Sequence, residues 1–362
     1  MPAPMVFGNA EERRRAMVHK KRKNRQLRSQ VNILRQLDSK FIESYRVDKD
    51  IFQTILSKIG NMLAERHRFI SPTTQLAATL RFLATGSYQL GIAKDQDMNI
   101  GRSTFSKILH STIEELENCI CEDNIQLKMS TAEMDLSKEY FYRTFNFPGV
   151  IGCIDGTHVK IVKPMMDESL FFNRKGYFSI NVMVYFYWQV CNYNMAILAV
   201  DASHPGSCHD SFIWNQSEVR QFYRNNSAPN TWILADSGYA LEHCILTPYR
   251  SPQYGSMEHK YNKKHAAARN KVERTIGVLK SLFRCLQGTL HFEPRFVGQI
   301  INVCCALHNI CRKRNIPVYE DDGRDEEIQH RNPDDENEGE TIPQADIDGV
   351  EVRNEVARTF LV

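Results

Sequence analysis

The spacing of apolar residues divides the chain into a helical N-terminal part and a strand-rich part. From Val31 to about Glu117, apolar residues recur at steps of three and four, as in Phe52, Ile55 and Ile59, which is the period of amphipathic helices. Beyond Pro148, runs of β-branched and aromatic residues are interrupted by Gly, Pro and Asn. Such runs predict strands.

The order of elements in the second part indicates the fold class. Strands are expected at 150–162, 178–190, 195–203 and 232–239, and helices at 211–222, 266–286 and 294–312. Three successive strands, a helix, a fourth strand and two further helices are typical of a mixed sheet flanked by helices. We therefore predict an α/β domain over residues 138–319, preceded by a helical domain over 31–137.

The helical part contains a candidate DNA-reading element. Ser71 and Pro72 suit the N-cap and first position of one helix, and a later helix is expected to begin at Arg102. This succession resembles a helix-turn-helix, in which Arg102 and Lys107 would face DNA. A bundle in which these helices only pack against one another is the alternative, and the sequence leaves both open.

Charge is distributed unevenly along the chain, although the net charge is only +3. Residues 320–362 hold 15 acidic residues and four arginines, a charge of −11, and residues 1–319 carry +14. A basic body favours a polyanionic partner, with nucleic acid first. The tail over 320–362 is rich in Asp, Glu, Asn and Pro and is predicted to be disordered.

The N-terminal arm, residues 1–30, concentrates nine lysines and arginines between Arg13 and Arg28. Such a run suits a phosphate-binding arm or a nuclear-import signal, and a merely solvated or disordered basic arm is the alternative. We expect a nuclear protein that can also occur in the cytoplasm.

Other classes of protein are disfavoured. The first residues lack the apolar core of a signal peptide, and the most apolar segment, 180–191, has about half the length of a membrane span. We therefore expect a soluble intracellular protein without membrane contact. The ten cysteines include no Cys-x-x-Cys pair, which argues against a structural zinc site.

Two aspartates end apolar runs of the expected strands. Asp155 lies in GCIDGTH and Asp236 in WILADSGY. A buried carboxylate is costly unless it is paired, hydrogen-bonded or bound to metal. Two of them at expected strand ends therefore suggest a shared cation.

A glutamate on the helix expected at 266–286 is the third candidate. Glu273 lies at the edge of the apolar stripe, and Gly277 leaves room on the same face. Basic residues around it suit a phosphate backbone; the candidates for DNA contact are Arg269, Arg274 and Lys280. Alternatively, Glu273 only pairs with Arg269 or Arg274 on a solvated face.

The three carboxylates together point to phosphoryl transfer. Eighty residues separate Asp155 from Asp236, and another 36 separate Asp236 from Glu273. Carboxylates suit hard divalent cations such as Mg²⁺ or Mn²⁺, and a pair of such ions can activate an attacking oxygen and stabilise a leaving one. We predict that Asp155 bridges the two cations.

Seven collinear segments resemble the PIF/Harbinger superfamily of DDE transposases, and within it the Harbinger transposase-derived nucleases. They are SPTTQLAATLRFLATGSYQ, PGVIGCIDGTHVKI, FFNRKGYFSINV, SHPGSCHDSFIW, WILADSGY, NKVERTIGVLKSLFRCL and CCALHNI. The resemblance covers about residues 70–315 and aligns the family's catalytic residues with Asp155, Asp236 and Glu273. It implies an RNase H-like fold, a metal-dependent nuclease or strand-transfer site, a DNA-binding helical region and a nuclear role.

The resemblance also implies partners and secondary site residues. Members often work with a Myb-like or SANT-like DNA-binding protein, and a homo-oligomer is a further expectation. Asp210, in the segment His209-Asp210-Ser211, is either an auxiliary metal or hydrogen-bonding group or the N-cap of the next helix. Arg174 and Lys175 form a loop suited to phosphate.

The sequence thus predicts a DNA endonuclease that hydrolyses phosphodiester bonds with two divalent cations. The alternatives are an active DNA transposase and a domesticated DNA-binding or scaffold protein that does not use its nuclease site. An enzyme acting on RNA is less favoured because no aromatic single-strand platform is evident.

Overall fold

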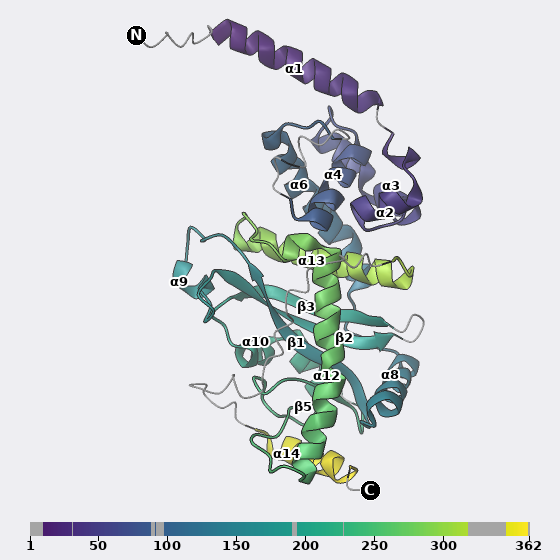
Figure 1. Ribbon diagram of the computed structural model, residues 1–362, viewed down its shortest axis with the longest axis vertical. Helices are drawn as coiled ribbons and strands as arrows, with labels where there is room; N and C mark the ends of the chain where they lie inside the picture. The colour runs from purple at the N-terminus through teal and green to yellow at the C-terminus, as the bar shows by residue number, and fades with distance from the viewer. Residues whose placement is uncertain are drawn as a thin grey trace. The chain divides into compact units, whose positions relative to one another are not determined.

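The protein divides into two compact units, Met1–Glu115 and Leu116–Val362. The computed structural model describes residues 10–30, 32–87, 91, 98–189, 194–226, 228–317 and 345–360. Figure 1 shows that the first unit is helical and that the second is built on a sheet.

The first unit consists of helices, as its apolar spacing predicts. The helices are α1 (Ala10–Gln30), η1 (Ile33–Arg35), α2 (Asp38–Tyr45), α3 (Lys49–Arg66), α4 (Pro72–Thr85) and α6 (Arg102–Leu116). The expected start of α4 is confirmed, because the Ser71 hydroxyl accepts a hydrogen bond from the Thr74 amide at 3.2 Å and Pro72 follows the cap. Helix α6 begins at Arg102, as predicted.

The basic arm forms helix α1, so residues 10–30 are helical rather than disordered, and a merely solvated arm stays an open alternative. Its side chains that the structure describes are almost all exposed. Thirteen of its 21 residues are Lys, Arg, Gln or Glu, and residues of these types have high helix propensity.

The second unit contains a five-stranded mixed sheet, and this confirms the α/β prediction. The strands are β1 (Val150–Lys160), β2 (Ser179–Gln189), β3 (Asn194–Pro205), β4 (Trp232–Leu234) and β5 (Ile245–Leu246), in the order β3-β2-β1-β4-β5. The first three strands are antiparallel neighbours, and β4 and β5 add in parallel to β1. The sequence pattern did not predict β5, because two residues are too few to show an alternation.

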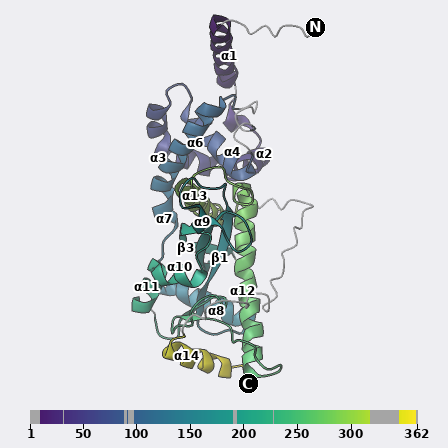
Figure 2. The ribbon, with the colours of Figure 1, turned by 90° about the vertical axis from the view of Figure 1, so that its left-hand side faces the viewer.

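Helices cover both faces of this sheet. They are α8 (Thr131–Phe145), α9 (Glu168–Phe171), α10 (Asp210–Gln216), α11 (Glu218–Asn226), α12 (Met257–Leu282) and α13 (Pro294–Lys313), with the short turns η2 (Glu117–Cys121), α7 (Glu122–Asn124) and η4 (Arg284–Leu286). Figure 2 shows α10 and α11 on one side of the strands and α12 on the other. No described helix is long and apolar enough to cross a membrane.

The second unit starts earlier than the boundary expected at residue 137. Helix α8 packs on β1 and β2, and it begins with a capping box in which Ser130 and Glu133 satisfy each other's backbone amides. The start of this helix is polar because these residues cap it and face solvent, while Phe141 further along is buried.

The core between the sheet and α10–α11 is aromatic. Trp214 and Tyr185 are fully buried, and the hydroxyls of Tyr185 and Tyr223 lie 2.9 Å apart. Helix α13 packs on the edge strand β3, where the Asn309 side chain accepts from the Ile197 amide at 2.9 Å and donates to its carbonyl at 2.7 Å. Asn309 thus satisfies an edge backbone that has no further strand beside it.

The expectation of a disordered tail is wrong for its last part. Residues Ile347–Arg358 form helix α14, which packs on α12 and β5. The Arg353 guanidinium lies 4.0 Å from the ring centre of Tyr249, and Phe360 is buried against Phe147 and Tyr261. A few apolar residues in this acidic stretch are enough to dock it, while residues 318–344 lie outside the described structure.

Candidate active site

Asp155 lies inside β1, not at its end as expected. It is buried, with 6% of its surface exposed, and accepts a hydrogen bond from the Gly156 amide at 3.0 Å. Strand β1 pairs with β2 along its whole length, but it pairs with β4 only as far as Cys153. Asp155 therefore lies just past the point where the parallel neighbour ends.

Asp236 follows the end of β4 by two residues and is also buried. Its Oδ1 accepts a hydrogen bond from the Gly238 amide at 2.9 Å, which fixes the turn after the strand. Cys153 and Leu234 are register partners in the parallel pair β1–β4. Asp155 and Asp236 both lie two residues further on, so the register brings the two carboxylates to the same height.

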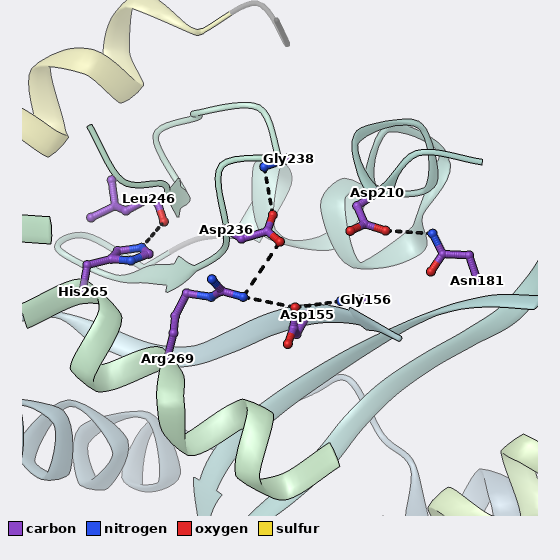
Figure 3. Close-up of polar contacts among 9 residues, drawn as sticks. All are labelled: Asp155, Gly156, Asn181, Asp210, Asp236, Gly238, Leu246, His265 and Arg269. Atoms are coloured by element: carbon purple, nitrogen blue, oxygen red, sulfur yellow. Dashed lines mark hydrogen bonds and ion pairs between the residues drawn. The ribbon is translucent and has the colours of Figure 1, made fainter. Parts of the chain in front are cut away.

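Arg269 of α12 joins the two aspartates (Figure 3). Its Nη2 lies 3.1 Å from Oδ1 of Asp155 and 3.9 Å from Oδ2 of Asp236, and its side chain is 14% exposed. Burial lowers the pKa of this guanidinium, but the charges of Asp155 and Asp236 outweigh burial and raise the pKa above its ordinary value. The structure therefore contains a buried triad of one cation and two carboxylates.

Burial raises the pKa of Asp155 to about 7, although Arg269 acts in the opposite direction. The carboxylates of Asp236, Asp210 and Glu273 add to the increase in this pKa. Repulsion from three further acids shows that negative charge is concentrated around Asp155. One guanidinium does not neutralise this negative charge, so further positive charge would bind favourably at the site.

Asp210 is the first residue of α10 and approaches Asp155 from the other helical layer. The N-cap of α10 is His209, so the interpretation of Asp210 as a cap is wrong. Its Oδ1 accepts a hydrogen bond from the Asn181 amide group at 2.8 Å. A Cβ atom at Gly156 would lie 2.7 Å from the same oxygen, so only glycine lets this carboxylate approach β1 so closely.

Glu273 differs from the aspartates in its surroundings. It lies one helical turn after Arg269 on α12, is exposed, and faces a region where a Cβ added to Gly277 would meet nothing within 4 Å. Among the described residues, no three His, Cys, Asp or Glu side chains already form a cluster that would hold a metal ion. The structure thus brings Asp155 and Asp236 together on Arg269 and leaves Glu273 at the open side.

The donors nevertheless fit a divalent cation. They are carboxylate oxygens, which are the ligands that Mg²⁺ and Mn²⁺ prefer. The guanidinium of Arg269 stands in for the positive charge that the two aspartates require.

The basic candidates fall into three settings. The Lys280 ammonium donates to the His158 carbonyl at 3.1 Å, and burial together with the charges of Lys160 and Lys175 lowers its pKa to about 8. Lys175 and Arg274 are exposed. Arg174 Nη2 lies 3.4 Å from Nδ1 of His209.

Arg102 and Lys107 lie in the first unit, exposed on α6. The sequence did not predict the contact of Arg269 with both aspartates. It predicted instead that Arg269 contacts a DNA phosphate. The spacing of four residues between Arg269 and Glu273 was the available signal, because it places both on one helix face.

Comparisons with known proteins agree with this geometry. A family described as DDE superfamily endonuclease matches residues 154–309, which include all three acidic candidates. The fold and the match place the chain in the DDE endonuclease superfamily.

Individual relatives show which family within this superfamily the chain belongs to. "Putative nuclease HARBI1" of Rattus norvegicus is 30% identical over 288 residues, which cover 78% of this chain and 80% of that protein. The Homo sapiens protein of the same name is 29% identical over the same share. "Protein ALP1-like" of Arabidopsis thaliana is 26% identical over 75% of this chain and 71% of its own length. The chain belongs to the family of Harbinger transposase-derived nucleases. No solved structure matches it significantly.

Proposed function

We propose that the protein is a transposase-derived DNA endonuclease that hydrolyses phosphodiester bonds with two divalent cations at Asp155, Asp236 and Glu273. The observation that supports this most is the pair of buried carboxylates at one height, just past the end of the parallel β1–β4 pairing. Such a pair, only partly neutralised by one cationic side chain, is costly to maintain without a function.

The topology supports the same proposal. Three antiparallel strands followed by two parallel ones, in the order β3-β2-β1-β4-β5 with helices on both faces, agree with the RNase H-like fold that the family resemblance implies. In this arrangement β1 is central. Strand β2 pairs with it at Asp155, and β4 pairs with it as far as Cys153. Rigid placement matters because a shift of about 1 Å in a reacting group can cost about 100-fold in rate.

Asp155 and Asp236 would hold the cations, with Glu273 joining them from α12. Bound Mg²⁺ or Mn²⁺ would lower the pKa of an attacking water and stabilise the charge on the leaving oxygen. The chain itself fixes the two aspartates through the Gly156 and Gly238 amides. Asp210 is proposed as an auxiliary group that adds negative charge near Asp155.

Basic side chains beside the carboxylates support a DNA substrate. Burial lowers the pKa of Lys280, and Lys160 and Lys175 are close enough that their charges lower it further. Three ammonium groups that repel one another favour an anion between them, and a strand of DNA carries regularly spaced phosphates. We propose that this cluster, with Arg174 and Arg274, holds the strand next to the scissile bond.

DNA reading is proposed for the first unit. Helix α6 buries Phe105, Ile108 and Leu109 and exposes Arg102 and Lys107 near its start. This agrees with a recognition helix, and also with the alternative of a simple bundle. Loss of DNA affinity in Arg102→Ala/Lys107→Ala, measured by fluorescence anisotropy on the full chain, would separate the two.

Nuclear action is proposed from the exposed basic helix α1. A fluorescent fusion that lacks residues 10–30 should shift towards the cytoplasm, and an unchanged distribution would contradict an import role. A Myb-like or SANT-like partner and self-association stay predictions.

The test of the proposed function is cleavage of supercoiled DNA by the full chain in Mg²⁺ or Mn²⁺. Asp155→Asn, Asp236→Asn and Glu273→Gln should each lower the rate by about 10³-fold, because each removes several kcal/mol of stabilisation from the transition state. The matched control is Asp201→Asn: Asp201 is a partly buried carboxylate of β3 that binds Ser203 and His204. Unchanged cleavage in Asp155→Asn would refute the proposal. Equal rescue of a cellular phenotype by that variant would favour the scaffold alternative.

A further inference from the structure

The guanidinium of Arg269 lies against both carboxylates that would share a cation. Its Nη2 contacts Oδ1 of Asp155 at 3.1 Å and reaches Oδ2 of Asp236 at 3.9 Å. Figure 3 shows the guanidinium directed at both carboxylates from helix α12. A metal ion on the same Asp155 oxygen would lie about 2.1 Å from it, and therefore no more than about 5 Å from this nitrogen.

The Arg269 guanidinium and a divalent cation at the aspartates would also repel each other electrostatically. A unit charge and a divalent ion about 6 Å apart repel enough to lower affinity by about tenfold even at the dielectric constant of water. In a partly buried site the repulsion is larger. Arg269 therefore weakens cation binding for as long as it stays on the aspartates.

The placement of Arg269 is not that of a fully satisfied structural arginine. Its Nε is buried and has no hydrogen-bond partner among the described residues. An unpaired buried donor costs on the order of 1–3 kcal/mol. The guanidinium is thus held by the charge of the aspartates and not by a complete set of hydrogen bonds.

The helix that carries Arg269 is anchored independently of this contact. One turn earlier, His265 lies 3.1 Å from the Leu246 carbonyl, and its ring stacks on Tyr261. On the other side of Arg269, around Glu273 and Gly277, the surface is open. The side chain of Arg269 can therefore leave the aspartates without movement of α12.

We propose that Arg269 is a positioning residue that holds Asp155 and Asp236 together in the metal-free protein and competes with the divalent cation for them. This rests on the proposed function, because it assumes that these aspartates bind a cation. Arg269 keeps two buried carboxylates paired when no metal is present, and it raises the cation concentration at which the site fills. The site is filled only when cation binding displaces the guanidinium.

The test is Mn²⁺ binding to the full chain, followed by the loss of the free-ion EPR signal. Arg269→Ala and Arg269→Gln should bind Mn²⁺ at least about tenfold more tightly than the wild type. Lys263→Ala is the matched control: it removes one positive charge from an exposed position of the same helix, and should change the affinity much less. A purely structural arginine gives the opposite result, because its loss would disorder the aspartates and weaken binding.

Thermal unfolding provides a second measurement in case the variants are unstable. In EDTA, Arg269→Gln should melt at a lower temperature than the wild type, because two carboxylates lose their partner. Added Mn²⁺ should raise its melting temperature more than that of the wild type. Equal or weaker Mn²⁺ affinity in both folded Arg269 variants, with wild-type binding that Asp155→Asn abolishes, would overturn the competition but not the proposed function. Absence of Mn²⁺ binding in every variant and in the wild type would overturn both.

Discussion

The carboxylates from the sheet and the carboxylate from helix α12 are held in different ways. Asp155 and Asp236 are buried, bonded to backbone amides and paired with Arg269. Glu273 is exposed beside open space. The sheet side is therefore rigid before any ligand binds, and the helix side is the part that can adjust.

This difference follows from the two kinds of scaffold. Parallel pairing of β1 and β4 ends two residues before each aspartate, and backbone hydrogen bonds thereby set the height of both. A helix surface fixes only the direction of a long side chain and not its end. The adjustable member of the site is thus a glutamate on a helix, and the fixed members are short aspartates within and just after strands.

The largest effect is expected from changing the side-chain length of the site carboxylates, which tests whether the sheet side is more rigid than the helix side. Asp155→Glu adds a methylene at a buried position and should lower cleavage by about 10³-fold, as complete loss of the ligand does. Glu273→Asp keeps a carboxylate at an open position and should cost no more than about 10²-fold. Single-turnover cleavage rates measure both. Equal losses would show that the helix side is as rigid as the sheet side.

The pH dependence of stability should distinguish the buried acid. The pKa of Asp155 is about 7, above its ordinary value of 3.8, so between these values the folded state holds a proton that the unfolded state loses. The contribution of Asp155 to stability is therefore full below pH 4 and is lost as the pH rises to about 7.

In EDTA, the wild type should lose about 2 kcal/mol more than Asp155→Asn between pH 5 and pH 7.5. Urea unfolding at the two pH values measures this difference. Parallel slopes for the two proteins would show that Asp155 titrates alike in the folded and unfolded states.

Two glycines provide the smallest test. Gly156→Ala places a Cβ 2.7 Å from Asp210 and should destabilise the protein by about 1–3 kcal/mol. Gly277→Ala meets nothing within 4 Å in the middle of α12 and should stabilise it by about 0.5–1 kcal/mol. Thermal unfolding gives the sign of each change. A destabilising Gly277→Ala would mean that the surface beside Glu273 is less open than the structure shows.

Most of the fold was predictable because the responsible patterns are local. The apolar run of β2 extends over residues 182–188 and the apolar stripe of α13 over more than ten residues, and the Ser71-Pro72 start of α4 is a signal of adjacent residues. Strand β5 and helix α14 were missed for the opposite reason. Two residues carry no period, and the apolar residues of α14 are too few to stand out from an acidic tail.

The sequence by itself determined which residues are available for chemistry: two aspartates after apolar runs, a glutamate on a basic helix, and the motifs that indicate the family. Tertiary structure decided what these residues do to one another. The parallel register aligns Asp155 with Asp236, and the packing of α12 on β1 brings the Arg269 guanidinium between them. The physical reason is that charges 114 positions apart in the chain interact only after folding excludes water from the space between them.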